Sequence, residues 1–324
     1  MLTIVMYHYV RELKQSRYPE IKGLELQLFK EQIEYILKHY TVVTMEEVIA
    51  AVSDPQMKLP SNALLLTFDD GYMDHYQYVF PILNEKKIQG SFFPPAKVVT
   101  EHQVLDVNKI HYILASVLDK TKLAEQILRK IEPYRLEYEL LSDNEYIKNY
   151  AIANRFDTKE VVFIKRMLQK GLPENLRNII TDELFKTFVY EDELTFSKEL
   201  YMNLDQIQCM KRNGMFIGSH SYDHYWLDTL SCEEQKQEID LSMEFLRQIG
   251  CDMDNWVMCY PYGAYNESLL QLLKERGCKV GLTTLVAIAD LNKDHPLTLP
   301  RLDTNDLPKD RNGEMNVWTR KVFF

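Results

Sequence analysis

Short apolar segments that alternate with amphipathic helical patterns constrain the fold of this chain most strongly. Runs of this length, rich in β-branched and aromatic residues, are typical of buried strands. The predicted strands are Leu2–Tyr7, Val42–Val43, Ala63–Phe68, Gly90–Phe93, Phe216–Gly218, Trp256–Cys259, Lys279–Leu282 and Leu297–Leu299. Because strands that alternate with helices usually form a mostly parallel sheet, we predict an α/β fold of barrel type.

Several of the helical patterns between these strands have recognisable ends. Leu28–His39 carries apolar residues at helical spacing. Thr44–Glu47 and Ser231–Glu234 have the spacing of a capping box, which opens a helix. Asn266–Arg276 is followed by Gly277, the residue type that most often ends a helix.

One long stretch lacks the strand pattern. Residues 106–202 contain only helical patterns, at Ile110–Leu118, Leu123–Ile131, Glu145–Ala153, Lys159–Gln169 and Glu174–Phe188. Loops tolerate long insertions because the entropy cost of closing a loop grows slowly with its length. We therefore predict a barrel in two parts, residues 1–105 and 203–324, with a helical insertion at residues 106–202.

Charge and cysteine content narrow the function classes. A net charge of −10 argues against nucleic-acid binding, which needs clustered basic residues. No apolar run reaches the roughly 18 residues of a transmembrane helix. The five cysteines form no CxxC pair, which suits reduced thiols, and the N-terminus lacks a signal-peptide pattern. We expect a cytoplasmic protein; an exported protein whose leader has been removed is the alternative.

Two adjacent carboxylates end one of the predicted strands. The apolar run Leu64–Phe68 leads directly into Asp69, Asp70 and Gly71. Two carboxylates at the end of a buried strand repel each other and lose hydration unless a cation neutralises them. A metal ion is the natural partner. The alternative is an Asx turn, in which the aspartates only cap the helix that begins near Tyr72.

Two more strand ends carry residues suited to chemistry. Phe216–Gly218 is followed by His220 and His224, and their spacing predicts a helical turn with both imidazoles on one face. Two imidazoles and a carboxylate make a three-ligand metal site, whereas exposed hydrogen-bonded histidines are the alternative. Trp256–Cys259 leads into Tyr260–Gly263, for which ordinary turn chemistry is the alternative. Because barrel active sites lie at the C-terminal ends of strands, the three motifs together predict a metal enzyme.

These motifs, in this order, resemble those of the polysaccharide deacetylase family, the NodB-homology domain of carbohydrate esterase family 4. The family's TFDDG motif stands at Thr67–Gly71, its H(S/T)xxH motif at His220–His224, and its RPPYG motif, altered, at Cys259–Gly263. The likeness covers about Met1–Val99 and Asn203–Arg301 and leaves the helical insertion outside. It implies a distorted (β/α) barrel of NodB type, with fewer strand–helix units than the regular eight.

The resemblance also implies a division of labour among the motif residues. Asp69 corresponds to the general base, and Asp70, His220 and His224 correspond to the ligands of one divalent metal ion. Zinc is the first expectation, and cobalt, nickel, iron or manganese would suit the same ligands. The backbone N–H of Tyr262 matches the donor that stabilises the oxyanion.

The sequence departs from the family at two positions. Cys259 replaces the arginine that usually steadies the base, and we predict that Arg301 supplies this charge from a neighbouring strand; a surface salt bridge is the alternative. The late histidine that serves as general acid is missing from Gly281–Thr284. His8 resembles the N-terminal histidine that takes this role in the circularly permuted poly-N-acetylglucosamine deacetylase branch. A core histidine is the alternative for His8, and His295 or solvent the alternative acid.

Together these residues imply a hydrolase that removes N-acetyl groups from the amino sugars of a polysaccharide or its precursor. The alternatives are a metal amidohydrolase for a nucleotide sugar, a lipid-linked sugar or another acyl amine, and a non-catalytic barrel that binds glycans. The sequence sets neither the oligomeric state nor the role of the insertion. Aromatic side chains beside the motifs either form a platform for a sugar ring or belong to the core: Tyr72, Tyr222, Tyr225, Trp226 and Tyr265.

Overall fold

A computed structural model describes residues 1–54, 56–154 and 157–323 of the chain. The chain divides into two compact units. The first contains Met1–Glu12, Gly23–Gln103 and Lys198–Phe324, and the second contains Leu13–Lys22 and Val104–Ser197. None of the described helices is long and apolar enough to cross a membrane.

The first unit is built on parallel strands. They are β1 (Thr3–Tyr7), β2 (Val10–Arg11), β3 (Leu24–Glu25), β4 (Thr41–Val42), β5 (Ala63–Asp69), β6 (Ser91–Phe93), β7 (Phe216–Ile217), β8 (Val257–Cys259), β9 (Val280–Leu282) and β10 (Leu302–Asp303). The main sheet has the order β10-β1-β5-β6-β7, and β4 also pairs with β5. Two smaller parallel pairs are β2–β3 and β8–β9. The prediction of an α/β fold with a mostly parallel sheet is confirmed.

Isolated bridges connect the main sheet to the β8–β9 pair. Ser219, just after β7, pairs in parallel with Met258 in β8. Leu282 in β9 pairs in parallel with Leu299, which lies just before β10. The pairings therefore run in a ring that two single bridges complete, and the C-terminal ends of neighbouring strands lie at the same edge.

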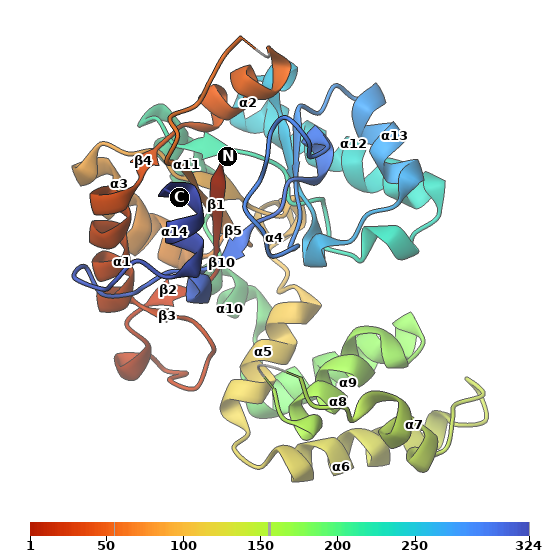
Figure 1. Cartoon of the computed structure of the whole chain (residues 1–324). Coiled ribbons are helices and arrows are strands. Elements are labelled where there is room, and N and C mark those ends of the chain that lie inside the picture. Colours follow the sequence, from red (N-terminus) through yellow and green to blue (C-terminus); the bar gives the residue numbers. More distant parts are fainter. Residues whose placement is uncertain (55, 155–156, 324) are drawn as a thin grey trace. The chain divides into compact units, whose positions relative to one another are not determined.

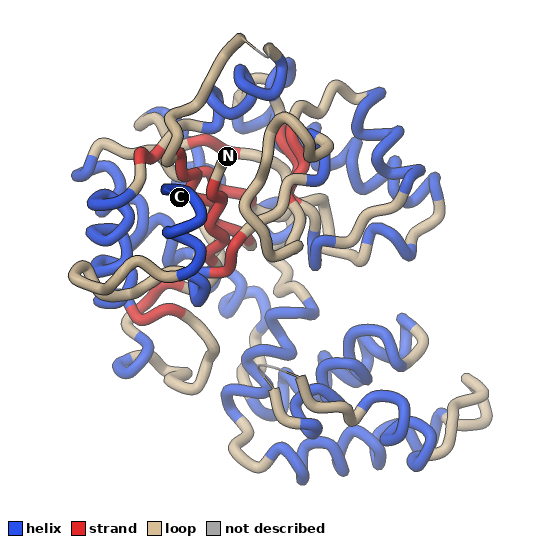
Figure 2. Tube along the Cα trace, in the orientation of Figure 1, coloured by secondary structure: helices blue, strands red, loops and turns tan. Residues whose placement is uncertain are grey.

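Helices lie outside these strands (Figure 1), and Figure 2 shows the strands gathered at the centre of the unit. The helices are α1 (Leu26–His39), α2 (Met45–Ser53), α3 (Phe80–Lys86), α4 (Ala96–Thr100), α11 (Leu204–Arg212), α12 (Cys232–Ile249), α13 (Glu267–Glu275) and α14 (Val317–Phe323). Both predicted capping boxes are present, at Thr44 before α2 and at Ser231 before α12. Gly277 follows α13 with φ 76°, as a helix-ending glycine should.

The strands of the ring share one apolar core. Side chains from five strands meet in a single buried cluster, among them Ile4 of β1, Leu65 of β5, Phe93 of β6, Val257 of β8 and Leu282 of β9. Alternate residues of a strand point to opposite faces, so each strand contributes one face to this cluster. Residues of α2 join the same cluster. Packing in this core thus fixes the positions of the strands whose ends carry the predicted motifs.

The second unit is helical in its described residues. Its helices are α5 (Asp106–Ser116), α6 (Lys120–Ile131), α7 (Asp143–Tyr150), α8 (Lys159–Arg166) and α9 (Glu174–Phe188), followed by α10 (Glu193–Leu200), which continues into the first unit. Each of the five predicted helical patterns coincides with one of α5 to α9. The segment Leu13–Lys22 joins this unit because Tyr18 packs edge-on against Tyr112 and donates a hydrogen bond to the Val189 carbonyl.

One strand prediction is wrong. Pro296–Thr298 forms a 3₁₀ turn, and only Leu299 of the predicted strand Leu297–Leu299 makes a β-bridge. Pro296 favours the turn because it has no N–H to donate and its φ is fixed at a helical value. The Nδ1 atom of His295 accepts the N–H of Leu297 and caps the turn. The strand begins later, at Leu302.

Gly281 provides a test of the ring closure between β9 and this turn. A Cβ at position 281 would lie 2.1 Å from the carbonyl oxygen of Leu297, a backbone atom that cannot move aside. We expect Gly281→Ala to lower the free energy of unfolding by about 1–3 kcal/mol in urea denaturation. The matched control is Gly277→Asn, in open space at positive φ, for which we expect a change of about 0.5 kcal/mol or less. Equal stabilities of the two variants would contradict the tight closure.

Candidate active site

The two carboxylates stand at the end of the central strand β5. Asp69 is its last residue, and Asp70 turns the chain with φ 72°. Gly71 also has positive φ, and a Cβ there would lie 2.7 Å from Cβ of Pro94. Only glycine therefore fits at position 71 without displacement of the chain after β6. The left-handed turn at Asp70 points the adjacent carboxylates into different surroundings.

Asp70 lies between the two motif histidines. Its Oδ1 atom is 3.3 Å from Nε2 of His220 and 3.4 Å from Nε2 of His224, and all three residues are buried. Tyr72 donates a hydrogen bond of 2.5 Å to the other oxygen of Asp70. Within the described part of the chain, Oδ1 has no properly aligned hydrogen-bond partner. Burial opposes ionisation of Asp70, but the neighbouring imidazoles hold its pKa well below the ordinary value.

These three residues fit a divalent cation. The Nδ1 atom of His220 lies 2.7 Å from the backbone carbonyl of Cys259, which can only accept, so Nδ1 carries the proton. With the proton of the neutral ring fixed on Nδ1, Nε2, which faces Asp70, is the nitrogen that would ligate a cation, as in metal-ligating histidines. One ionised carboxylate and two imidazoles, with one ligand atom from each within 4.8 Å of the others, form a suitable donor set.

The predicted helical turn between the histidines is wrong. Residues 220–224 form a loop after β7 in which Ser221 and His224 have positive φ, 60° and 58°. The loop brings the two imidazole centroids to 4.8 Å. Glu238 of α12, buried, accepts the N–H groups of Tyr222 and Asp223. Backbone hydrogen bonds to this side chain replace those of a helix, and no feature of the sequence singles Glu238 out for this task.

Arg301 forms a buried ion pair with Asp69. Its two terminal nitrogens donate to the two oxygens of Asp69 at 2.9 and 2.8 Å, and its Nε donates to the Thr283 carbonyl at 2.8 Å. Both side chains are at most 2% exposed. Burial alone would raise the pKa of Asp69, but the charges of Arg301 and His220 lower it to about 2. Asp69 is therefore an anion in a fixed orientation.

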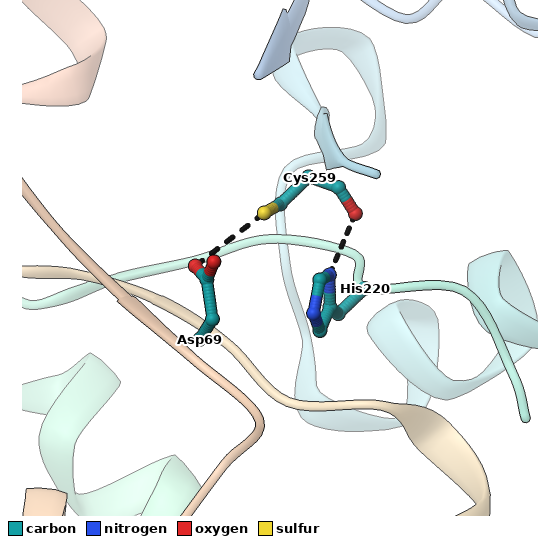
Figure 3. Close-up of side chains that lie close together, drawn as sticks. All are labelled: Asp69, His220 and Cys259. Atoms are coloured by element: carbon teal, nitrogen blue, oxygen red, sulfur yellow. Dashed lines mark hydrogen bonds between the residues drawn. The ribbon is translucent and has the colours of Figure 1, made fainter. Parts of the chain in front are cut away.

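Cys259, at the end of β8, touches both motifs (Figure 3). Its thiol lies 3.4 Å from Oδ1 of Asp69, and its carbonyl accepts from His220. Burial raises the pKa of the thiol, so the thiol stays protonated and donates to the carboxylate. Asp69, His220 and Cys259 also cluster closely enough to hold a metal. However, both oxygens of Asp69 already accept from Arg301, so the site around Asp70 suits a cation better.

The other predicted residues lie at the same edge. His8 directly follows β1, and its Nε2 atom is 3.9 Å from Oδ2 of Asp69, with 40% of its side chain exposed. Tyr262 has φ 57° and stacks on Trp226 at 4.3 Å between ring centroids, beside His224. The proposed platform role is wrong for Tyr72, which is fully buried against Tyr9. Trp226 is half-buried, and its role in a platform stays a prediction.

Comparisons with known proteins agree with this arrangement. The family model described as polysaccharide deacetylase matches residues 56–150 and 187–281, together more than half of the chain. Both ranges extend into the helical unit, further than the motifs alone suggested, whereas His8 and Arg301 lie outside them. YxkH of Bacillus subtilis (strain 168), which carries a polysaccharide deacetylase name, is 29% identical over 84 residues. That match spans 26% of this chain and only 30% of the relative's length.

Solved structures of deacetylases share the fold at low sequence identity. Deacetylase PplD of Streptococcus pyogenes, in complex with acetate, has a TM-score of 0.56 at 18% identity, covering 95% of this chain and 92% of that one. IcaB from Ammonifex degensii has a TM-score of 0.54 at 17% identity, covering 94% and 91%. The BpsB deacetylase domain from Bordetella bronchiseptica has a TM-score of 0.53 at 14% identity, covering 93% and 95%.

The metal-ligand assignment has a direct test. We expect His220→Ala and His224→Ala to lose the divalent ion that the purified wild-type protein retains, because each removes one of three ligands. Elemental analysis after dialysis measures the metal content per chain. His102→Asn is the matched control: His102 lies outside the cluster and has positive φ, which asparagine tolerates. A His220→Ala protein that keeps stoichiometric metal would refute the assignment.

Proposed function

Because the chain belongs to the polysaccharide deacetylase family, we propose that it is a metal-dependent hydrolase that removes N-acetyl groups from the amino sugars of a polysaccharide or its precursor. One observation carries the proposal. The buried carboxylate of Asp70 and the imidazoles of His220 and His224 lie close enough together to hold a cation, beside a second carboxylate, Asp69, that Arg301 holds ionised.

In this proposal Asp70, His220 and His224 hold one divalent cation. When bound, such a cation supplies Lewis-acid polarisation of the acyl carbonyl and makes water more acidic at neutral pH. Zinc suits the donor set, as do cobalt, nickel, iron and manganese. Tyr72 and the Cys259 carbonyl orient the ligands from behind, because each makes a hydrogen bond to the side of a ligand that faces away from the site.

Asp69 is the proposed general base. Its carboxylate is ionised, and two hydrogen bonds from Arg301 fix its orientation. Oδ1 accepts from both Arg301 and the Cys259 thiol, whereas Oδ2 keeps a second acceptor position after it has accepted from Arg301, so Oδ2 can still take a proton from attacking water. The separate surroundings of Asp69 and Asp70 support one base and one ligand rather than two equivalent ligands.

His8 and Tyr262 complete the proposed machinery. His8 lies near the same oxygen of Asp69 that Arg301 binds, but its side chain is 40% exposed, so in this proposal its imidazole is accessible to the departing amine and protonates it. The N–H of Tyr262, in a left-handed turn after β8, is the proposed oxyanion donor. The products would be acetate and a free amino sugar, and the reported complex of PplD with acetate is consistent with acetate release by that relative.

Acetate release is the decisive measurement. We expect the metal-loaded protein to release acetate from an N-acetylglucosamine polymer or oligomer, and Asp69→Asn to keep its metal while turnover falls by about 10²-fold or more. Nucleotide-sugar and simple acyl-amine substrates serve as further arms. Release only from those would contradict the polysaccharide substrate, and no release from any would contradict the enzyme. Metal loss in Asp69→Asn would contradict the separation of base and ligand.

His8 should shape the pH–rate profile. A general acid must be protonated to act, so the rate of the wild-type enzyme should fall at high pH. His8→Ala should lower kcat and abolish this basic limb, while its metal content and thermal unfolding stay at the wild-type level. His295→Ala is the matched control, because that side chain caps a turn at Leu297 instead. An unchanged profile in His8→Ala would transfer the acid role to another group.

A further inference from the structure

The segment Tyr72–His75, which follows the two carboxylates, makes side-chain contacts with the segment His8–Arg11. Three side chains of the first segment together contact all four residues of the second. Tyr72 stacks on Tyr9 with ring centroids 4.0 Å apart. Asp74 accepts the Val10 N–H at 3.2 Å and Nε of Arg11 at 2.7 Å. His75 reaches the backbone of His8 itself, with Nε2 2.9 Å from its carbonyl oxygen.

The hydrogen bond from His75 has a defined direction. The His8 carbonyl can only accept, so Nε2 of His75 carries the proton. His75 is fully buried, and burial lowers its pKa to about 4, so the ring is neutral near neutral pH. Its other nitrogen, Nδ1, has no hydrogen-bond partner among the described residues. The hydrogen bond to the His8 carbonyl is therefore the polar interaction that satisfies the buried ring.

The backbone and packing around His75 keep its ring in place. His75 begins a π-helix, His75–Val79, in which the Phe80 N–H bonds to the His75 carbonyl. Such wide turns occur mostly in short pieces and often at functional sites. The ring lies against Phe68 of β5 and Phe92 of β6, with centroid distances of 5.7 Å to each. Both aromatic residues belong to the strands of the ring, so His75 is held by the sheet.

We propose that His75 is a positioning residue for His8: it holds the carbonyl of His8 and thereby sets the position of the imidazole opposite Asp69. β1 ends at Tyr7, so His8 lies beyond the ladder that orders the strand. Its Nε2 is 3.9 Å from Oδ2 of Asp69, beyond direct hydrogen-bond distance, so the place of the imidazole beside the carboxylate depends on the backbone that carries it. The inference rests on the proposed acid role of His8.

The groups that act on His8 come from separate elements. Asp69 at the end of β5, Asp70 after it and His224 in the loop after β7 interact with His8 electrostatically, as does His75 itself. Of these four residues, His75 is the one whose side chain bonds to the backbone of His8 in the described part of the chain. We therefore expect a change at His75 to act on the position of His8, while Asp69 keeps its two hydrogen bonds from Arg301.

The test compares substitutions that keep or remove this donor. His75→Gln places an amide N–H near the position of Nε2, whereas His75→Asn is one methylene shorter and His75→Met has no donor. We expect His75→Gln to stay within about threefold of wild-type kcat, and His75→Asn and His75→Met to lose about 10- to 100-fold and to weaken the basic limb of the pH–rate profile, with metal content and KM unchanged. The control Val79→Ala alters a buried residue of the same π-helix away from His8 and should lower Tm without a change in profile.

A double-mutant cycle separates positioning from general support of the fold. If His75 acts through His8, then His75→Asn should cause no further loss of kcat in the His8→Ala background. An equal loss in both backgrounds, or a normal profile in His75→Asn, would overturn the inference while the acid role of His8 stands. A basic limb that persists in His8→Ala alone would instead contradict the proposed function. Should His75→Met not fold, the His75→Asn and His75→Gln pair decides the outcome.

Discussion

The buried pair of Arg301 and Asp69 is the interaction on which the rest of the site depends. Removing one partner of such a pair leaves an uncompensated charge in the interior, which costs far more than the pair contributes when intact. The two residues are 232 positions apart in the chain, but Arg301 directly precedes β10 and Asp69 ends β5, and only β1 lies between these two strands in the sheet. They meet only because the last segment pairs with both β9 and β1. The ring of strands must therefore close for the charge of Asp69 to be balanced by Arg301.

Neighbouring groups, and not the residue type, distinguish the two adjacent aspartates. Asp69 faces the guanidinium of Arg301 and the thiol of Cys259, which keep its carboxylate ionised and fix its orientation. Asp70 faces two imidazoles and one tyrosine hydroxyl, which leave one oxygen directed at the histidines. The left-handed turn at Asp70 allows this separation within two consecutive residues. Two carboxylates in contrasting surroundings can perform two tasks, which is the usual basis for a base beside a metal ligand.

Cys259 shows how the site accommodates a departure from the family pattern. The residue is buried at the end of β8, with its thiol directed at the same carboxylate that Arg301 binds. A second guanidinium at this position would face the first across Asp69, and two buried cations beside one anion would be unbalanced. A neutral thiol keeps the charge at one pair and adds a weak donor. The charge that balances Asp69 thus comes from Arg301, just before β10, and not from position 259.

The sequence alone determined the α/β class, the helical character of residues 106–202 and the motif positions, because these follow from local periodicity and from residue types at strand ends. It also indicated that Asp69, Asp70, His220 and His224 belong together, since parallel strand ends share one edge. Only the tertiary structure decided that Arg301 pairs with Asp69, that a loop held by Glu238 joins the two histidines, and that His75 grips His8. These are contacts between distant segments whose geometry depends on ring closure and side-chain packing, which leave no periodic trace in the sequence.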